Sequence, residues 1–457
     1  MNTTALPGME SLNDTEVGDA GVTPSSAASD PALDAPRLRR PDRDQHYLVP
    51  TRLEDLLPAD HEARMVWDVV ERLDLSAFHA PLKARGSDPG RSATDPKLLV
   101  ALWLYATLNN VGSARELERL CGAHDAYRWL CGGVSINHHT LSDFRTGHER
   151  ALDALFTQVV AKLVHTKIVG VERISQDGTR VRASAGAASF RREPRLNELL
   201  EEARAHVERL KRQLAAPAVA ACSKARQAAQ ERAARERVAR IERALAQLPE
   251  QKAAQEKLSK KVAAARDKTP RVSTTDPEAR VMKMPNGGFN PAYNIQLATD
   301  TQSRAIVGVS VTNAGVDTGQ AEPMRAQVEQ RAGMKPREHL LDGGYLRLEE
   351  IDRSAAEGVA LYVPPKPPRN AQKRASAYEP RAGDSPAQAV WRERMGSEAG
   401  RRVYRLRGAT SETANADLKT HRGLDRLLVR GVRKVRCVAL WSALAYNLMH
   451  FASVWVT

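Results

Sequence analysis

Three acidic residues have the types and settings of a metal-dependent site for phosphoryl chemistry: Asp177, Asp342 and Glu412. Asp177 and Asp342 each follow a short apolar run typical of a β-strand, whereas Glu412 lies in a stretch with a helical pattern. Carboxylates brought together from such elements can hold a pair of Mg²⁺ ions, which need hard oxygen ligands in near-octahedral geometry. The sequence therefore predicts metal-assisted phosphoryl transfer, provided that the fold brings the three residues into one pocket.

The setting of the two aspartates predicts where they emerge from a sheet. A carboxylate beside apolar strand residues costs free energy unless it is paired, hydrogen-bonded or bound to a cation. Because each aspartate precedes a glycine, we expect both to emerge near a sheet edge, where a cleft is a natural ligand site. Taken alone, each Asp-Gly pair is also a common turn sequence, and Glu412 also fits an exposed helical residue without a task.

Composition favours a globular protein with a polyanionic partner. The chain has 457 residues, enough for two or three domains, and 42% of them are apolar. A formal net charge of +14 favours binding to phosphates, although charge alone does not separate DNA from RNA or an anionic membrane. The four cysteines form no CxxC pair, which fits a reducing cytosol, and no secretory signal begins the chain.

The last twenty residues, from Val438 onward, carry no full charge and are long enough to span a bilayer. Tyr446, Asn447 and His450 interrupt this stretch. We therefore expect a buried core helix in preference to a membrane anchor.

Local patterns divide the chain into four parts. Residues 1–44 have the composition of a disordered leader, and residues 45–150 have the pattern of a helical domain, with Asp95 as a helix N-cap. Residues 160–457 alternate strand and helix patterns, which predicts an α/β domain. Within it, residues 191–268 are rich in Ala, Glu, Arg and Lys, which predicts a helical, coiled-coil-like insertion.

Several blocks, in their order along the chain, resemble the DDE transposases of bacterial insertion sequences. The first three are similar to the InsH-type N-terminal domain of these enzymes, and the others contain or accompany the three acidic residues: 90–99, 113–118, 140–145, 177–179, 292–296, 342–345 and the helix of Glu412. The resemblance implies a catalytic domain with an RNase H-like mixed sheet flanked by helices. It also implies that the 45–150 domain binds DNA.

The resemblance further implies a function and roles for individual residues. It implies metal-dependent DNA cleavage and strand transfer at insertion-sequence ends, with Asp177, Asp342 and Glu412 as catalytic residues that bind two Mg²⁺ ions, for which Mn²⁺ can substitute. Tyr404, Arg407 and Lys419 match a Tyr-x2-Arg and Glu-x6-Lys signature and would contact DNA. Glu412 and Lys419 are two helical turns apart and therefore lie on one face.

Two departures from that signature concern the helix of Glu412. The step from Arg407 to Glu412 is one residue longer than usual, and Asn415 stands where an aromatic residue is often found. The partners implied are double-stranded DNA, as terminal inverted repeats and as target, and a second copy of the chain in a dimer or higher oligomer. No membrane partner is implied, and the location implied is the bacterial cytoplasm, at the nucleoid.

Two alternative functions remain open from the sequence. One is a nuclease of the same fold that cuts DNA without strand transfer. The other is a DNA-binding derivative that has lost catalysis, which three carboxylates too far apart to share metal ions would favour.

Overall fold

The computed structural model describes residues 52–82, 92–214, 221–256, 269–366 and 375–456. All of them belong to one compact unit, Thr51–Thr457. The predicted leader, residues 1–44, lies outside the described residues.

The N-terminal part consists of helices. Among them, α3 is apolar on all sides and almost wholly buried, as expected of a central helix. The Asp95 side chain accepts a hydrogen bond from the Lys97 amide, which confirms the predicted N-cap of α3. The helices are η1 (Leu53–Leu56), α1 (Glu62–Glu71), α2 (Ser76–His79), α3 (Pro96–Leu108), α4 (Ala114–Ala123), α5 (Asp125–Cys131), α6 (His138–Gly147) and α7 (Glu149–His165).

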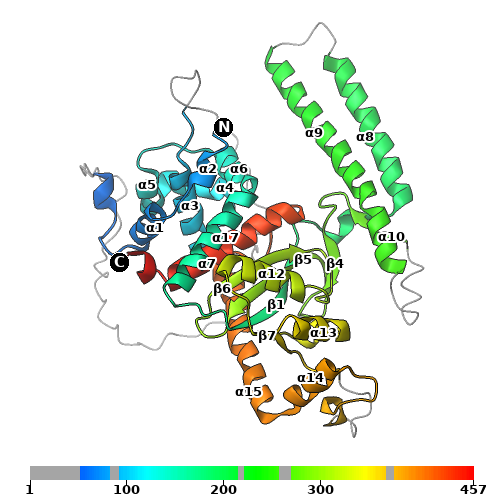
Figure 1. Cartoon of the computed structure of the whole chain (residues 1–457). Coiled ribbons are helices and arrows are strands. Elements are labelled where there is room, and N and C mark those ends of the chain that lie inside the picture. The colour runs from blue at the N-terminus through cyan, green and yellow to red at the C-terminus, as the bar shows by residue number, and fades with distance from the viewer. Residues whose placement is uncertain (1–51, 83–91, 215–220, 257–268, 367–374, 457) are drawn as a thin grey trace, which may run out of the picture. The chain divides into compact units, whose positions relative to one another are not determined.

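A mixed sheet follows, in the strand order β4-β5-β1-β7-β8, with β6 paired to β5. β5 runs antiparallel to β1, β4 and β6, whereas β1, β7 and β8 are parallel to one another. This sheet with its flanking helices confirms the predicted α/β fold class (Figure 1). The strands are β1 (Arg173–Arg182), β4 (Arg280–Lys283), β5 (Phe289–Asp300), β6 (Ile306–Thr312), β7 (Glu338–Leu340) and β8 (Ala360–Tyr362).

Helices contact both faces of the sheet. On one face α12 lies over β6, where Met324 and Val328 approach Gly308. On the other face η7 contacts β1 and β5. The remaining helices of this region are α12 (Ala321–Ala332), η4 (Gly343–Tyr345), α13 (Leu348–Ala356), η6 (Ala375–Tyr378), α14 (Pro386–Gly396), α15 (Glu398–Arg407), η7 (Gly408–Glu412), α16 (Thr413–His421), α17 (Val432–His450) and α18 (Ser453–Val456).

The segment predicted as an insertion contains α8 (Glu193–Leu214), α9 (Ala221–Ala246) and α10 (Leu248–Glu256). α8 and α9 pack side by side through apolar residues that include Leu196, Leu200 and Ile241 (Figure 1). A short 3-10 turn, η2 (Ala187–Ser189), and the two-stranded sheet of β2 (Phe190–Arg191) and β3 (Val272–Ser273) stand at the base of this segment.

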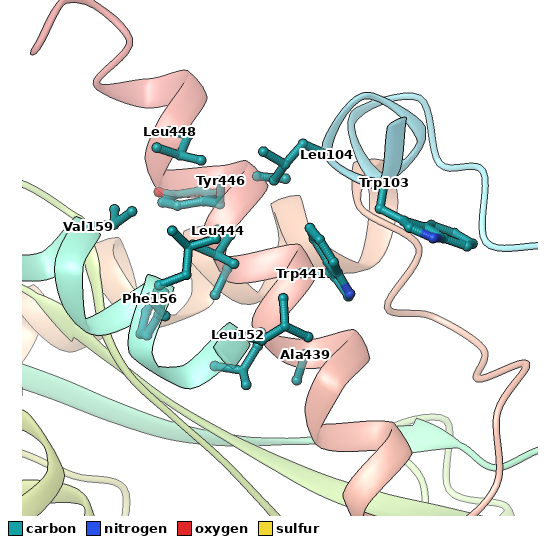
Figure 2. Close-up of a cluster of buried hydrophobic side chains, with 14 of the residues drawn as sticks. Trp103, Leu104, Leu152, Phe156, Val159, Ala439, Trp441, Leu444, Tyr446 and Leu448 are labelled. Carbon is teal, nitrogen blue, oxygen red and sulfur yellow. The ribbon is translucent and has the colours of Figure 1, made fainter. Parts of the chain in front are cut away.

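The C-terminal helix α17 joins the N-terminal helices to the sheet in one core. Its Trp441 and Leu444 are fully buried, and they lie among side chains of α3 and α7 such as Trp103 and Phe156 (Figure 2). This is the buried core helix that the sequence predicts. Among the described residues, no helix is long and apolar enough to cross a membrane.

Asn447 is a polar residue inside this apolar helix, and its side chain forms hydrogen bonds with the edge of the sheet. Its Oδ1 accepts a hydrogen bond from the Ile306 amide at 2.9 Å, and its Nδ2 donates to the Ile306 carbonyl at 2.7 Å. Ile306 begins the edge strand β6, so the side chain satisfies two buried backbone groups that have no strand beside them.

We therefore predict that Asn447→Ala lowers the free energy of unfolding by about 2 to 4 kcal/mol, because it leaves two buried backbone groups without partners. The measurement is the urea dependence of unfolding, followed by circular dichroism. Asn109→Ala is the matched control, since the Asn109 amide bonds only within its own turn. Equal stability of the two variants would contradict this role of Asn447.

Candidate active site

Asp177 lies in the middle of β1, not at the end of a strand, so the expectation that it emerges near a sheet edge is wrong. β5 pairs with β1 from Ile174 to Arg182, which keeps the Asp-Gly pair in an extended strand and out of a turn. On the other side, β7 pairs only with Arg173–Ser175. Asp177 therefore stands just past the point where β1 loses its second neighbour.

Asp342 follows β7 directly, as the sequence predicts. Its side chain accepts a hydrogen bond from the Gly344 amide at 2.7 Å and caps η4. Because β7 runs parallel to β1, the chain emerges from β7 on the side where Asp177 lies. The two carboxylates are close enough for the charge of Asp342 to raise the pKa of Asp177.

Glu412 ends the π-helical turn η7. Its side chain is 67% exposed, and its Oε1 lies 3.9 Å from Arg407 Nη2. Arg407 Nη1 lies 3.5 Å from Asp177 Oδ1, so the guanidinium stands between the two acidic residues. The structure thus brings Asp177 and Asp342 together and leaves Glu412 beside them, across Arg407.

The π-helical turn gives a physical account of the unusual spacing in this helix. A π turn holds one residue more than an α-helical turn. The additional residue between Arg407 and Glu412 falls in this turn, Gly408–Glu412. After the turn, α16 continues in regular form and carries Asn415 and Lys419.

Asn415 is a site residue to which the sequence analysis assigned no role. Its Nδ2 donates a hydrogen bond to Asp177 Oδ2 at 2.9 Å, and the residue is buried. The sequence signal was its position, where a polar amide replaces the usual aromatic residue. An amide there supplies Asp177 with a donor that an aromatic ring lacks.

The three residues predicted to contact DNA surround the same carboxylate. Burial lowers the pKa of Lys419, and Asp177 opposes that shift. Burial would also lower the pKa of Arg407, but Asp177 and other neighbours raise it above its usual value. Burial raises the pKa of Tyr404, whose hydroxyl neighbours Arg407.

Asp317 is a further acidic residue at the site, and the sequence analysis did not single it out. It lies in the loop between β6 and α12, and its Oδ1 accepts hydrogen bonds from Asn294 Nδ2 at 2.7 Å and Gln296 Nε2 at 2.8 Å. The available signal was this pair of amide residues at alternate positions within 292–298, whose other residues are apolar. The structure buries both amides fully. Buried amides need polar partners, and here one partner is Asp317.

Burial and neighbouring charges together set the protonation of Asp177. Burial raises its pKa to about 6, Arg407 opposes the shift, and Asp342 and Asp317 add to it. A carboxyl group with this pKa lies in surroundings that disfavour a further negative charge. A cation is the kind of ligand that such surroundings favour.

The donor set of Asp177 and Asp342 fits Mg²⁺, whereas Glu412 in this conformation is not part of it. Among the described residues, no group of three or more His, Cys, Asp or Glu side chains lies close enough to hold a metal ion. Mg²⁺ usually keeps several water ligands and needs only one or two carboxylates from the protein. The two aspartates meet that requirement, and Glu412 would have to turn inward to join them.

Comparisons with protein families agree with this geometry. Residues 51–147 match the model described as a transposase domain (DUF772), and residues 259–448 match the model described as a transposase DDE domain. The chain belongs to the insertion-sequence DDE transposases. The sheet of this transposase is accordingly the RNase H-like sheet of the DDE domain.

Two of the three acidic residues of the site lie inside the range that matches the DDE-domain model, and one lies outside it. Asp342 and Glu412 lie inside the range of the DDE-domain match, whereas Asp177 lies before its start and is joined to it by the pairing of β1 with β5 and β7. No curated protein and no solved structure matches the chain.

The raised pKa of Asp177 predicts a pH-dependent effect of Asp177→Asn on the stability of the metal-free transposase. The folded-state pKa of about 6 exceeds the ordinary value of 3.8, so ionised Asp177 destabilises the fold, with no effect below about pH 4 and the full effect above about pH 6. The variant should therefore be more stable than the wild type at pH 7.5, by on the order of 2 kcal/mol, and should lose most of this advantage at pH 4.5.

The measurement is urea unfolding at both pH values in the presence of a chelator. Asp425→Asn, at an exposed position, controls for the loss of one negative charge. A destabilised Asp177→Asn variant at pH 7.5 would show that the ion pair with Arg407 outweighs the burial of the carboxylate.

Proposed function

We propose that this transposase cuts DNA at the ends of an insertion sequence and joins the freed 3′-hydroxyl to target DNA, with Asp177, Asp342 and Glu412 as its catalytic carboxylates. The observation that carries the proposal is the parallel pairing of β1 with β7, which places Asp342 near enough to Asp177 for the two charges to act on each other. Family membership supports an enzyme that acts on DNA. It does not by itself assign the triad or the strand-transfer step.

The carboxylates would hold Mg²⁺, or Mn²⁺ in its place, in a two-ion site. The bound ions would supply charge stabilisation and an activated hydroxyl for in-line displacement at phosphorus. The role of the protein would be to hold the ligating side chains in position. Asn415 and Arg407 orient Asp177, and the Gly344 amide orients Asp342. Glu412 would turn inward to complete the set, and its exposed side chain is free to do so.

Arg407, Lys419 and Tyr404 would meet the DNA backbone beside these carboxylates. The guanidinium of Arg407 has the planar, forked geometry that binds a phosphate through two parallel hydrogen bonds. A DNA phosphate would compete with Asp177 and Glu412 for Arg407. Arrival of the DNA would thereby release both carboxylates for metal binding.

The wider organisation proposed rests on the family. The helical region 45–150 would bind the terminal inverted repeats, and residues 160–457 would form the catalytic domain, with residues 191–268 as an insertion in it. Because two DNA ends must be brought together, the active form would be a dimer or higher oligomer on DNA. It would act at the nucleoid in the cytoplasm.

Two observations favour a rival function. The outward side chain of Glu412 and the absence of a three-acid group among the described residues are what a DNA-binding protein without catalysis would display. The next experiment separates this rival from the proposed enzyme.

We predict that Asp177→Asn, Asp342→Asn and Glu412→Gln each abolish strand cleavage while binding of end DNA is largely retained, because each removes a ligating charge with little change of shape. The measurement is a gel assay of cut and joined products with labelled end DNA in Mg²⁺ or Mn²⁺. Ca²⁺, which is larger and more loosely coordinated, should support binding without efficient chemistry.

Asp425→Asn is the control for charge loss and should cleave like the wild type. Near-normal cleavage by any one of the three variants would remove that residue from the triad. Binding of end DNA without cleavage by the wild type would favour the non-catalytic rival, and cut products without joined products would favour a nuclease.

A separate prediction concerns Lys419, which has donors only and cannot ligate a cation. Lys419→Ala should weaken binding of cleaved-end DNA several-fold while Mn²⁺ affinity stays within twofold, as followed by fluorescence anisotropy and calorimetry. Lys335→Ala is the control, since Lys335 is an exposed lysine outside the site. Unchanged affinity for end DNA would make Lys419 a helix residue without a role in binding.

A further inference from the structure

We propose that Asp317 is a fourth carboxylate of the metal site and shares a divalent cation with Asp342. The proposal rests on the proposed function of the same site and adds a residue from a different loop and from the opposite face of β1. Asp177 faces α16, whose Asn415 donates a hydrogen bond to it, whereas Asp317 lies on the face of the sheet that α12 covers. Asp342, at the end of β7, stands near both.

Asp317 is held in place by two buried side chains of β5. Asn294 and Gln296 are both fully buried, and both direct an amide donor at the same oxygen, Asp317 Oδ1. Fixing one oxygen with two donors orients the whole carboxylate. Among the described residues no donor is bonded to Oδ2, so this oxygen is available to a ligand.

The available oxygen and Asp342 face the same small volume. A Cβ atom built on Gly344 would lie 2.9 Å from Asp342 Oδ1 and 3.5 Å from Asp317 Oδ2. Glycine at this position therefore leaves open the space that both carboxylates border. The Thr318 hydroxyl donates to the Gly344 carbonyl at 3.0 Å and ties the two loops together.

Gly178 provides a second, independent observation. A Cβ atom on Gly178 would overlap Asp317 Oδ1, so the Asp-Gly pair of β1 makes room for the Asp317 side chain. The same position lies 2.8 Å from Asn294 Oδ1, which is buried and has no hydrogen-bond partner among the described residues. An unsatisfied buried acceptor beside a carboxylate needs a donor or a cation.

The chemistry of this group is that of a hard divalent cation. Two carboxylates with water ligands are a common protein contribution to a Mg²⁺ site. Without a cation, Asp317 and Asp342 border one space with two like negative charges, which repel each other. A cation bound between Asp317 and Asp342 would offset that repulsion and fix the position of Asp342.

The test is the affinity of the full-length protein for Mn²⁺, measured by calorimetry and by the electron paramagnetic resonance of free Mn²⁺. Asp317→Asn keeps an oxygen that accepts from Asn294 and Gln296 but removes the charge. We expect its Mn²⁺ affinity to fall at least tenfold, with an unchanged urea midpoint. Asp425→Asn is the matched control and should bind Mn²⁺ like the wild type.

A shared cation also predicts non-additive losses. The double variant of Asp317→Asn and Asp342→Asn should lose little affinity beyond the Asp342→Asn variant, because both ligands serve one ion. Full additivity of the two losses would overturn a shared site, and Mn²⁺ affinity of Asp317→Asn within twofold of the wild type would overturn the role of Asp317.

Failure of this inference is distinguishable from failure of the proposed function. If Asp317→Asn binds Mn²⁺ and cleaves like the wild type while Asp177→Asn does not cleave, the proposed function stands and the role of Asp317 falls. If the wild type does not cleave end DNA, the proposed function fails, and the Mn²⁺ titration still decides whether Asp317 is a ligand.

Discussion

The burial of a charged carboxylate at Asp177 is the constraint on which the arrangement of the rest of the site depends. A carboxylate in the middle of a central strand is stable only if donors or cations surround it. Arg407, the last residue of α15, and Asn415 of α16 supply those contacts. Asn415 and Arg407 leave room for a cation, which would complete the neutralisation of the Asp177 carboxylate. The electrostatics of this one side chain are thereby connected to the proposed chemistry of the enzyme.

A second set of contacts joins the sheet to the N-terminal helices. α17 packs against the N-terminal helices and contacts β6, where the Asn447 amide stands in for a missing strand. The site therefore rests on a core shared by regions far apart in sequence. β1 and β7 pair in parallel, and the register of this pairing determines that Asp342 emerges beside Asp177.

Local sequence patterns could predict some of this site, and distant contacts account for the rest. The position of Asp342 directly after a strand could be predicted from the apolar run before it. The N-cap at Asp95 could be predicted from its local sequence. Asp177 was misplaced because an Asp-Gly pair is typical of turns, whereas here glycine makes room for Asp317, 139 positions away in the sequence. Asn415 and Asp317 were not recognised, since both act through partners on other elements.

The most direct test of the central claim is to locate the cation. Crystals of the full-length protein with end DNA and Mn²⁺, measured at the manganese absorption edge, would give an anomalous peak at each bound ion. Our account predicts peaks within coordination distance of Asp177 and Asp342, with Arg407 turned toward a DNA phosphate. Manganese bound elsewhere, with Arg407 still between Asp177 and Glu412 in crystals whose DNA has been cut, would contradict it.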